Sequence, residues 1–221
     1  MKTTHIAMML IMAVTAGAFA QEAGKVKVEM ALPKAQFIGT PKDIKGLKNL
    51  EAPRNGKLRE PIYVPEGCNK LLSKDTKVTS SDPEPIIGEL SFITDGDKEH
   101  GADTYVELGP AKQWIQVDLG AEHQIYAMNL WHFHGEARVY RAVVVQVSND
   151  PDFIDGVVTV FNNDAENMLN LGVGKEQEYI ETNEGRPFAV DGVKGRYVRF
   201  YSKGNTSNEM NHYTEVKVYG K

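Results

Sequence analysis

The stretch that decides the fold is Trp114-Ile-Gln-Val-Asp-Leu-Gly120. Its side chains alternate strictly, with Ile115, Val117 and Leu119 on one side and mostly polar residues on the other. Because successive side chains of a β-strand point to opposite faces, this pattern predicts a strand with one buried face.

Two later stretches repeat this alternation close to the end of the chain. Arg196-Tyr-Val-Arg-Phe-Tyr201 is one, and Glu215-Val-Lys-Val-Tyr-Gly220 is the other, with its two valines on the face opposite Glu215 and Lys217. Many short strands without a long amphipathic helix predict an all-β antiparallel sandwich or jelly roll. Further strand signals, separated by Asp-Gly and Asn-Asp-Pro turns, lie at 125–133, 142–148 and 157–161.

Together the three motifs resemble the discoidin family, also called coagulation factor 5/8 type C or galactose-binding-like domains. Members typically carry W-I-x-V-D-L-G early, R-Y-V-R late, and a glutamate strand ending in V-Y-G. The resemblance covers roughly residues 68–220 and implies an antiparallel jelly-roll β-sandwich of the galactose-binding-domain-like type. It further implies a non-catalytic binding module, similar to bacterial carbohydrate-binding modules, so we expect no enzymatic activity.

Residues 1–20 have the features of a secretory signal peptide. Lys2 is followed by an apolar run over 6–18 and by Ala18-Phe-Ala20, a small-x-small cleavage site. The sequence therefore predicts a secreted or periplasmic protein that starts near Gln21. An uncleaved anchor is the alternative, which the shortness of the apolar run disfavours.

Charge limits the possible partners of the mature chain. The formal charge of the 221 residues is −5, and it becomes −6 without residues 1–20, which hold one lysine and no acid. An acidic exported protein is a poor candidate for nucleic-acid binding or for strong binding to anionic membranes.

The remaining chain divides into a leader, residues 21–67, and a β-sandwich domain, residues 68–221. The leader is rich in proline and lysine and is expected to be an extended linker, partly packed on the domain. Inside the domain, 162–185 is a polar, acidic insertion, interpreted as a solvated decoration, with a functional loop as the alternative. Cys68 is the single cysteine of the sequence, so no disulfide can form within one chain.

The turn Thr94-Asp-Gly-Asp97 resembles a family turn that holds a structural calcium ion in many sugar-binding members. Calcium prefers hard oxygen ligands, and the family closes the cage with a glutamate from the last strand. The resemblance implies Ca²⁺ bound by Asp95, Asp97, Thr104 and Glu215. A longer connection puts Thr104 in question, with Asp103 as a substitute, and a plain Asp-Gly turn without metal is the alternative.

His132 and His134 flank Phe133 on a predicted strand, so both imidazoles lie on one face. Such a pair is a known transition-metal motif, and a metal-dependent enzyme is therefore one hypothesis. The resemblance offers another, because the family places a sugar-binding loop after this strand. The implied ligand residues are His132, His134, Arg138 and Tyr140, joined by the amides of a second loop at Asn205, Asn208 and Asn211.

Three functions remain open at this point. The first is a glycan-binding module for a cell-surface or extracellular glycan. The second is an adhesion module that binds other exported proteins. The third is the metal-dependent enzyme built on the histidine pair. Neither the sugar nor the oligomeric state follows from the sequence.

Overall fold

The computed structural model describes residues 24–37, 44, 46–101 and 103–221. The predicted signal peptide, residues 1–20, lies outside this part of the chain. Within the described residues, no helix has the length and apolar character needed to cross a membrane.

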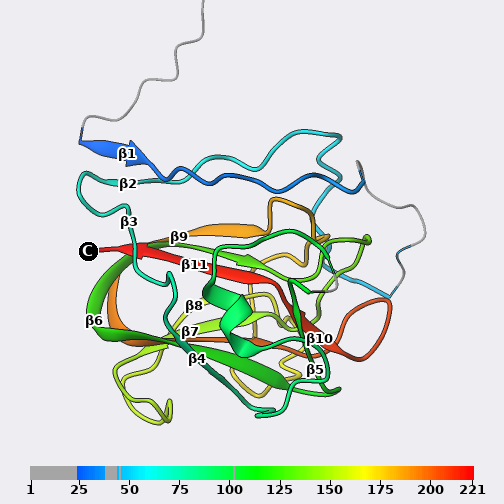
Figure 1. The fold of residues 1–221 in the computed structure, drawn as a ribbon. Helices are drawn as coiled ribbons and strands as arrows, with labels where there is room; N and C mark the ends of the chain where they lie inside the picture. Colours follow the sequence, from blue (N-terminus) through cyan, green and yellow to red (C-terminus); the bar gives the residue numbers. More distant parts are fainter. Residues whose placement is uncertain (1–23, 38–43, 45, 102) are drawn as a thin grey trace, which may run out of the picture.

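The structure is an antiparallel β-sandwich, as the sequence predicts (Figure 1). One short 3₁₀ helix, η1 (Leu90–Thr94), lies beside the strands. The strands are β1 (Lys25–Lys27), β2 (Tyr63–Pro65), β3 (Lys70–Leu71), β4 (Lys77–Ser80), β5 (Val106–Leu108), β6 (Gln113–Trp131), β7 (Val144–Ser148), β8 (Val158–Asn162), β9 (Arg186–Ser202), β10 (Asn211–Tyr213) and β11 (Glu215–Gly220).

The long strands β6 and β9 belong to both layers of the sandwich. The first half of β6 pairs with β4 and with the second half of β9, which continues to β7 and β8. The second half of β6 pairs with β11 and with the first half of β9. Both strands therefore bend between the layers, and the curve of β6 is visible in Figure 1.

The bend in β6 lies at the end of the Trp114–Gly120 motif. The pairing register of β6 with β9 shifts between Asp118 and His123. Gly120 lies there with a φ of 82°, a left-handed conformation that glycine adopts without steric cost, and its N–H donates to the Asp118 carboxylate at 2.8 Å. The Asp-Leu-Gly ending is thus where the chain leaves one layer for the other.

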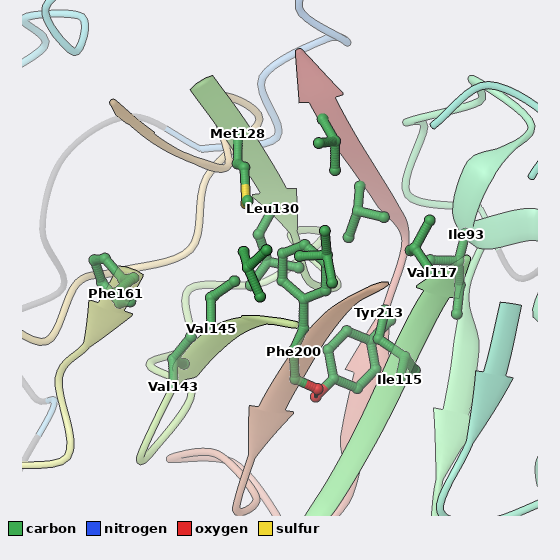
Figure 2. Packing of buried hydrophobic residues seen from close by; sticks show 14 of the residues in the cluster. Ile93, Ile115, Val117, Met128, Leu130, Val143, Val145, Phe161, Phe200 and Tyr213 are labelled. Atoms are coloured by element: carbon green, nitrogen blue, oxygen red, sulfur yellow. Dashed lines mark hydrogen bonds between the residues drawn. The ribbon is translucent and has the colours of Figure 1, made fainter. Parts of the chain in front are cut away.

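The apolar faces of the two layers meet in one core. Ile115 and Val117 come from the first half of β6 and Met128 and Leu130 from the second half, and all four are fully buried. Figure 2 shows these side chains packed around Phe200. The alternation read from the sequence is confirmed, because Leu119, Val198, Val216 and Val218 are buried in the same cluster.

The opposite faces of the same motifs pair with each other. Asp118 accepts two hydrogen bonds from the Arg196 guanidinium, at 2.7 and 2.9 Å. Arg199 donates to the Gln116 side chain and its guanidinium lies 4.1 Å from the Trp114 ring centroid. The polar positions of the motifs therefore hold β6 and β9 in register.

The leader lies along the second layer rather than extending away from it (Figure 1). β1 pairs with β2, and Val28 and Val64 are buried in one cluster with Cys68 and Tyr219. An apolar face of the leader thus covers the outer surface of β6 and β11 at this end of the sheet.

Salt bridges attach the leader to the end of the 162–185 insertion. The Glu184 carboxylate accepts from the Arg54 guanidinium and from the Arg59 N–H, each at 2.5 Å. Arg59 also donates through both terminal nitrogens to Glu51, at 2.7 and 2.9 Å. The backbones join as well, because Glu51 donates to the Glu178 carbonyl at 2.8 Å.

The interpretation of the insertion as a solvated decoration is wrong for much of its length. Tyr179, Glu181 and Glu184 are buried, and so is Leu169. Asp164 is also buried, and its carboxylate accepts the backbone N–H groups of Met168 and Leu169 at 2.9 and 2.8 Å. Asp164 thus folds the backbone of the insertion, and Glu184 binds the arginines of the leader.

Candidate functional site

The loops that follow β6 and β9 meet at one end of the sandwich. β5 pairs with β10, with His212 opposite Glu107, and this brings residues 105–107 next to the second loop. The loop after β6 reaches the same place, since Tyr140 forms a bridge with Asn205. The two segments predicted to form a ligand surface, 131–140 and 202–212, therefore lie side by side.

Two partly exposed aromatic rings and a guanidinium lie at this end, and we call Tyr105, Phe133 and Arg138 the platform. The Tyr105 and Phe133 rings meet edge to face, with centroids 5.0 Å apart. The Arg138 guanidinium lies 4.7 Å from the Phe133 ring centroid and donates to the exposed Glu136 carboxylate at 2.9 Å. The platform therefore combines aromatic surface with fixed hydrogen-bonding groups.

A chain of buried polar groups supports the platform from inside. Glu107 bonds to Nε2 of His212 at 2.9 Å, and Nδ1 of His212 bonds to the Tyr140 hydroxyl at 3.0 Å. The Tyr140 ring stacks on His132, with centroids 4.1 Å apart and planes inclined by 12°. His132 then bonds through Nδ1 to the Glu181 carboxyl at 3.0 Å, so the chain ends on the insertion.

Burial decides the protonation of this chain. Desolvation raises the pKa of Glu181 to about 8 and lowers that of His132 to about 3. Desolvation, helped by the nearby Arg138 cation, also lowers the pKa of His212 to about 4. At neutral pH the two histidines are therefore neutral and the Glu181 carboxyl is largely protonated.

The structure places four of the predicted ligand residues in the interior. His132 and Tyr140 are 0% and 1% exposed, because the stacked pair fills the space between the platform and the insertion. His134 is buried, with Nε2 2.7 Å from the Lys98 carbonyl oxygen. Arg138, expected in an exposed ligand loop, is 9% exposed because its guanidinium packs over the Phe133 ring.

The three asparagines of the second loop build the loop itself. The side-chain amide of Asn211 accepts the Gly204 N–H and donates to the Gly109 carbonyl, both at 2.8 Å. Asn205, also buried, bonds through its amide to the Asn208 side chain at 2.7 Å, and Asn208 is the exposed member of the three. Their turn-forming role thus accounts for their hydrogen bonds.

Sequence reasoning did not include Tyr105, Glu107 or Phe133 among the ligand residues. Tyr105 and Glu107 surround Val106, which is fully buried, so their outward orientation was readable from the alternation in β5. Their proximity to His212 could not be read from the sequence, since it depends on the pairing of β5 with β10, about a hundred residues apart.

The oxygens of the four residues predicted to hold calcium are bonded to backbone groups of the turn and its continuation, 96–99. Asp95 accepts the Asp97 N–H and Asp97 accepts the Glu99 N–H, at 2.8 and 2.9 Å. The Thr104 hydroxyl points to the Glu99 carbonyl at 2.6 Å, and buried Glu215 accepts the Gly96 N–H at 3.1 Å. In this arrangement the residues do not fit a calcium ion, and calcium stays a prediction from the resemblance.

The histidine pair is divided between two environments. His132 is bonded to Glu181, whereas His134 bonds to a backbone carbonyl, and its ring centroid lies 6.0 Å from that of His100. Across the described residues, no group of three or more His, Cys, Asp or Glu side chains is arranged to hold a metal ion.

Solved structures with similar folds contain carbohydrate-binding modules. A family 89 glycoside hydrolase from Clostridium perfringens matches with a TM-score of 0.52 and 19% identity, over 68% of this chain and 14% of the hydrolase. Truncated AlyQ, with CBM32 and alginate lyase domains, matches with 0.50 and 21%, over 69% of this chain and 34% of AlyQ. At these identities the likeness shows the fold alone.

A single carbohydrate-binding module shows the same likeness of fold over its whole length. The CBM32 module of the Clostridium perfringens enzyme, in complex with GalNAc-β-1,3-galactose, matches with a TM-score of 0.50 and 14% identity, over 68% of this chain and 100% of that module. No curated protein matches the sequence.

The family comparison covers the centre of the sandwich. Residues 92–200, from η1 to the second half of β9, match the model of the NedA-like galactose-binding domain of the F5/F8 type C class. This segment contains both the Trp114–Gly120 motif and the Arg-Tyr-Val-Arg motif that pair across β6 and β9. The resemblance to the F5/F8 type C, galactose-binding-like family that the motifs carry is therefore confirmed over residues 92–200.

Proposed function

We propose that this protein is an exported, non-catalytic module that binds a glycan at the platform. The observation that carries the proposal is the placement of Tyr105, Phe133 and Arg138 at the loop end of a galactose-binding-like domain. A CBM32 module with a similar fold forms a complex with GalNAc-β-1,3-galactose, which supports this assignment.

The platform offers what a neutral sugar needs. An aromatic ring can stack on the apolar C–H face of a pyranose, and the phenol of Tyr105 and the carboxylates of Glu107 and Glu136 supply directional hydrogen bonds. Buried residues such as His132 and Tyr140 then act by holding the platform in place. Asn208 remains the exposed amide that is available at the edge.

A glycan array on the mature chain identifies the ligand, and calorimetry with Tyr105→Ala and Phe133→Ala tests the site. We expect each substitution to weaken binding roughly tenfold, the effect of about 1.4 kcal/mol. Tyr63→Ala is the matched control, since Tyr63 is an exposed tyrosine on β2 in the leader. Equal affinities for all three variants would move the ligand site away from the platform.

Protein adhesion is the alternative outcome of the same array. If no glycan binds the wild-type chain at millimolar concentration, the module binds other exported proteins instead. Activity of the purified chain on a glycan would contradict the non-catalytic part of the proposal.

Export rests on the sequence of residues 1–20. Intact-mass measurement of the native protein tests it, with a mature chain starting near Gln21 in the periplasm or medium as the expected result. A soluble cytoplasmic form that retains residues 1–20 would contradict export.

A further inference from the structure

Three segments meet around the turn that was predicted to bind calcium. The β3–β4 connection is tied to β11, because Ser73 donates to the Val216 carbonyl and accepts the Val218 N–H, at 3.1 and 3.0 Å. It is also tied to η1, since Asp75 donates to the Thr94 carbonyl at 2.9 Å. Residues 73–76, 94–98 and 215–217 thus form one compact corner.

Two lysine ammonium groups occupy this corner. Lys74 donates through Nζ to the Asp95 carbonyl and, at 2.7 Å, to the Asp75 carboxylate. Lys98 donates through Nζ to the Gly96 carbonyl at 2.9 Å. The carbonyl oxygens of the turn, which are the hard ligands that a calcium ion would require, are therefore already bonded to cations from the chain itself.

Backbone geometry fixes the path of one of these lysines. Gly96 has a φ of 91°, a conformation that favours glycine, and a Cβ added there would lie 3.5 Å from Lys74 Nζ and 3.7 Å from its Cε. The Lys74 side chain thus lies across the turn, over the site where Gly96 has no side chain. This placement lets its ammonium group reach the Asp95 carbonyl.

The positive charges around the turn also disfavour a bound calcium ion. Lys217 follows Glu215 on β11 and interacts electrostatically with Lys98, so a third ammonium group lies at the corner. A divalent cation placed among three ammonium groups meets repulsion that a calcium cage made of carboxylates and carbonyls does not have. The carboxylates of Asp95 and Asp97, meanwhile, bond to backbone N–H groups.

We propose that Lys74 and Lys98 replace the structural calcium ion, so that the turn 94–98 folds without any divalent cation. Both ammonium groups bond to carbonyl oxygens of the turn, and Lys74 also ties the turn to the β3–β4 connection. The chain carries its own cations at the place where the resemblance implies a bound metal.

The test compares melting temperatures of the full mature chain in millimolar calcium and in chelator. We expect the wild type to melt at the same temperature in both. Lys98→Gln should lower the melting temperature by about 2–4 °C, and the double change Lys74→Gln with Lys98→Gln should lower it further. Lys98→Arg, which keeps the charge and the donor, should melt close to the wild type.

Lys70→Gln is the matched control, because Lys70 is an exposed lysine of β3 in the same region. A rise of the wild-type melting temperature with calcium, abolished by Glu215→Gln, would overturn the proposal. The proposal also fails if Lys98→Gln behaves like Lys70→Gln, since the ammonium group would then contribute nothing to the turn.

Discussion

Arg138 shows how one residue can belong to both the interior and the binding surface. The residue is 9% exposed, its guanidinium lies 4.7 Å from the Phe133 ring centroid, and its charge pairs with the Glu136 carboxylate. A residue type that usually lies in solvent is here a part of the packing, because long arginine stems bury well against aromatic rings.

We predict that Arg138→Ala lowers the free energy of unfolding by about 1–2 kcal/mol and weakens glycan binding as well, because it removes packing from Phe133. Thermal or urea unfolding measures the first effect and calorimetry the second. Arg141→Ala is the control, since Arg141 is exposed three residues further along. Equal stability of the two variants would show that Arg138 carries no packing.

At the scale of elements, the strands could be predicted from the sequence and their environment could not. Alternation placed Ile115, Val117 and Leu119 on the buried face, because period two follows from strand geometry alone. It could not reveal that His132 and Tyr140 are interior, since both have polar tips and His132 bonds to Glu181, 49 residues further along the chain. The contacts that attach the leader were unreadable for the same reason, because Arg54 and the Arg59 N–H bond to Glu184, more than a hundred residues later.

The attachment of the leader gives a prediction of its own. Glu184 is buried and accepts from both Arg54 and the Arg59 N–H, so Glu184→Ala leaves two donors without a partner. We expect a loss of about 2 kcal/mol in the free energy of unfolding. Glu176→Ala is the matched control, because Glu176 is 53% exposed and 4.0 Å from Arg186. A loss below about 0.5 kcal/mol for both would mean that the leader is only loosely attached.

At the scale of the whole molecule, four buried groups with strongly shifted pKa values govern how stability depends on pH. Between pH 4.5 and about 8 the folded protein keeps protons on Glu181 and Glu215 that the unfolded chain has lost, so both carboxyls make stability fall as the pH rises through this window. As the pH falls below 6.5, the unfolded chain protonates His132 and His212 while the folded protein resists, so stability falls again.

These four groups therefore predict nearly constant stability between about pH 4.5 and 6.5, where the carboxyl and histidine contributions offset each other, and a loss from pH 6.5 to about 8. Melting temperatures measured from pH 4 to pH 9 test this expectation, and Glu181→Gln should reduce the loss on the alkaline side because its amide cannot ionise. A wild-type profile that keeps rising to pH 8 would show that Glu181 and Glu215 are ionised in the folded protein.

The leader also has a consequence for the order in which the chain folds. Residues 54–59 leave the ribosome early, yet Arg59 bonds to Glu184 and Gly185, which follow 125 and 126 residues later. The buried cluster around Val28 likewise includes Tyr219, which lies on the last strand. Contacts between positions so distant in sequence are typical of slow folding. These contacts of the leader can form only after synthesis has reached residues 184–185 and Tyr219, so the leader cannot complete its packing before the final strand has been made.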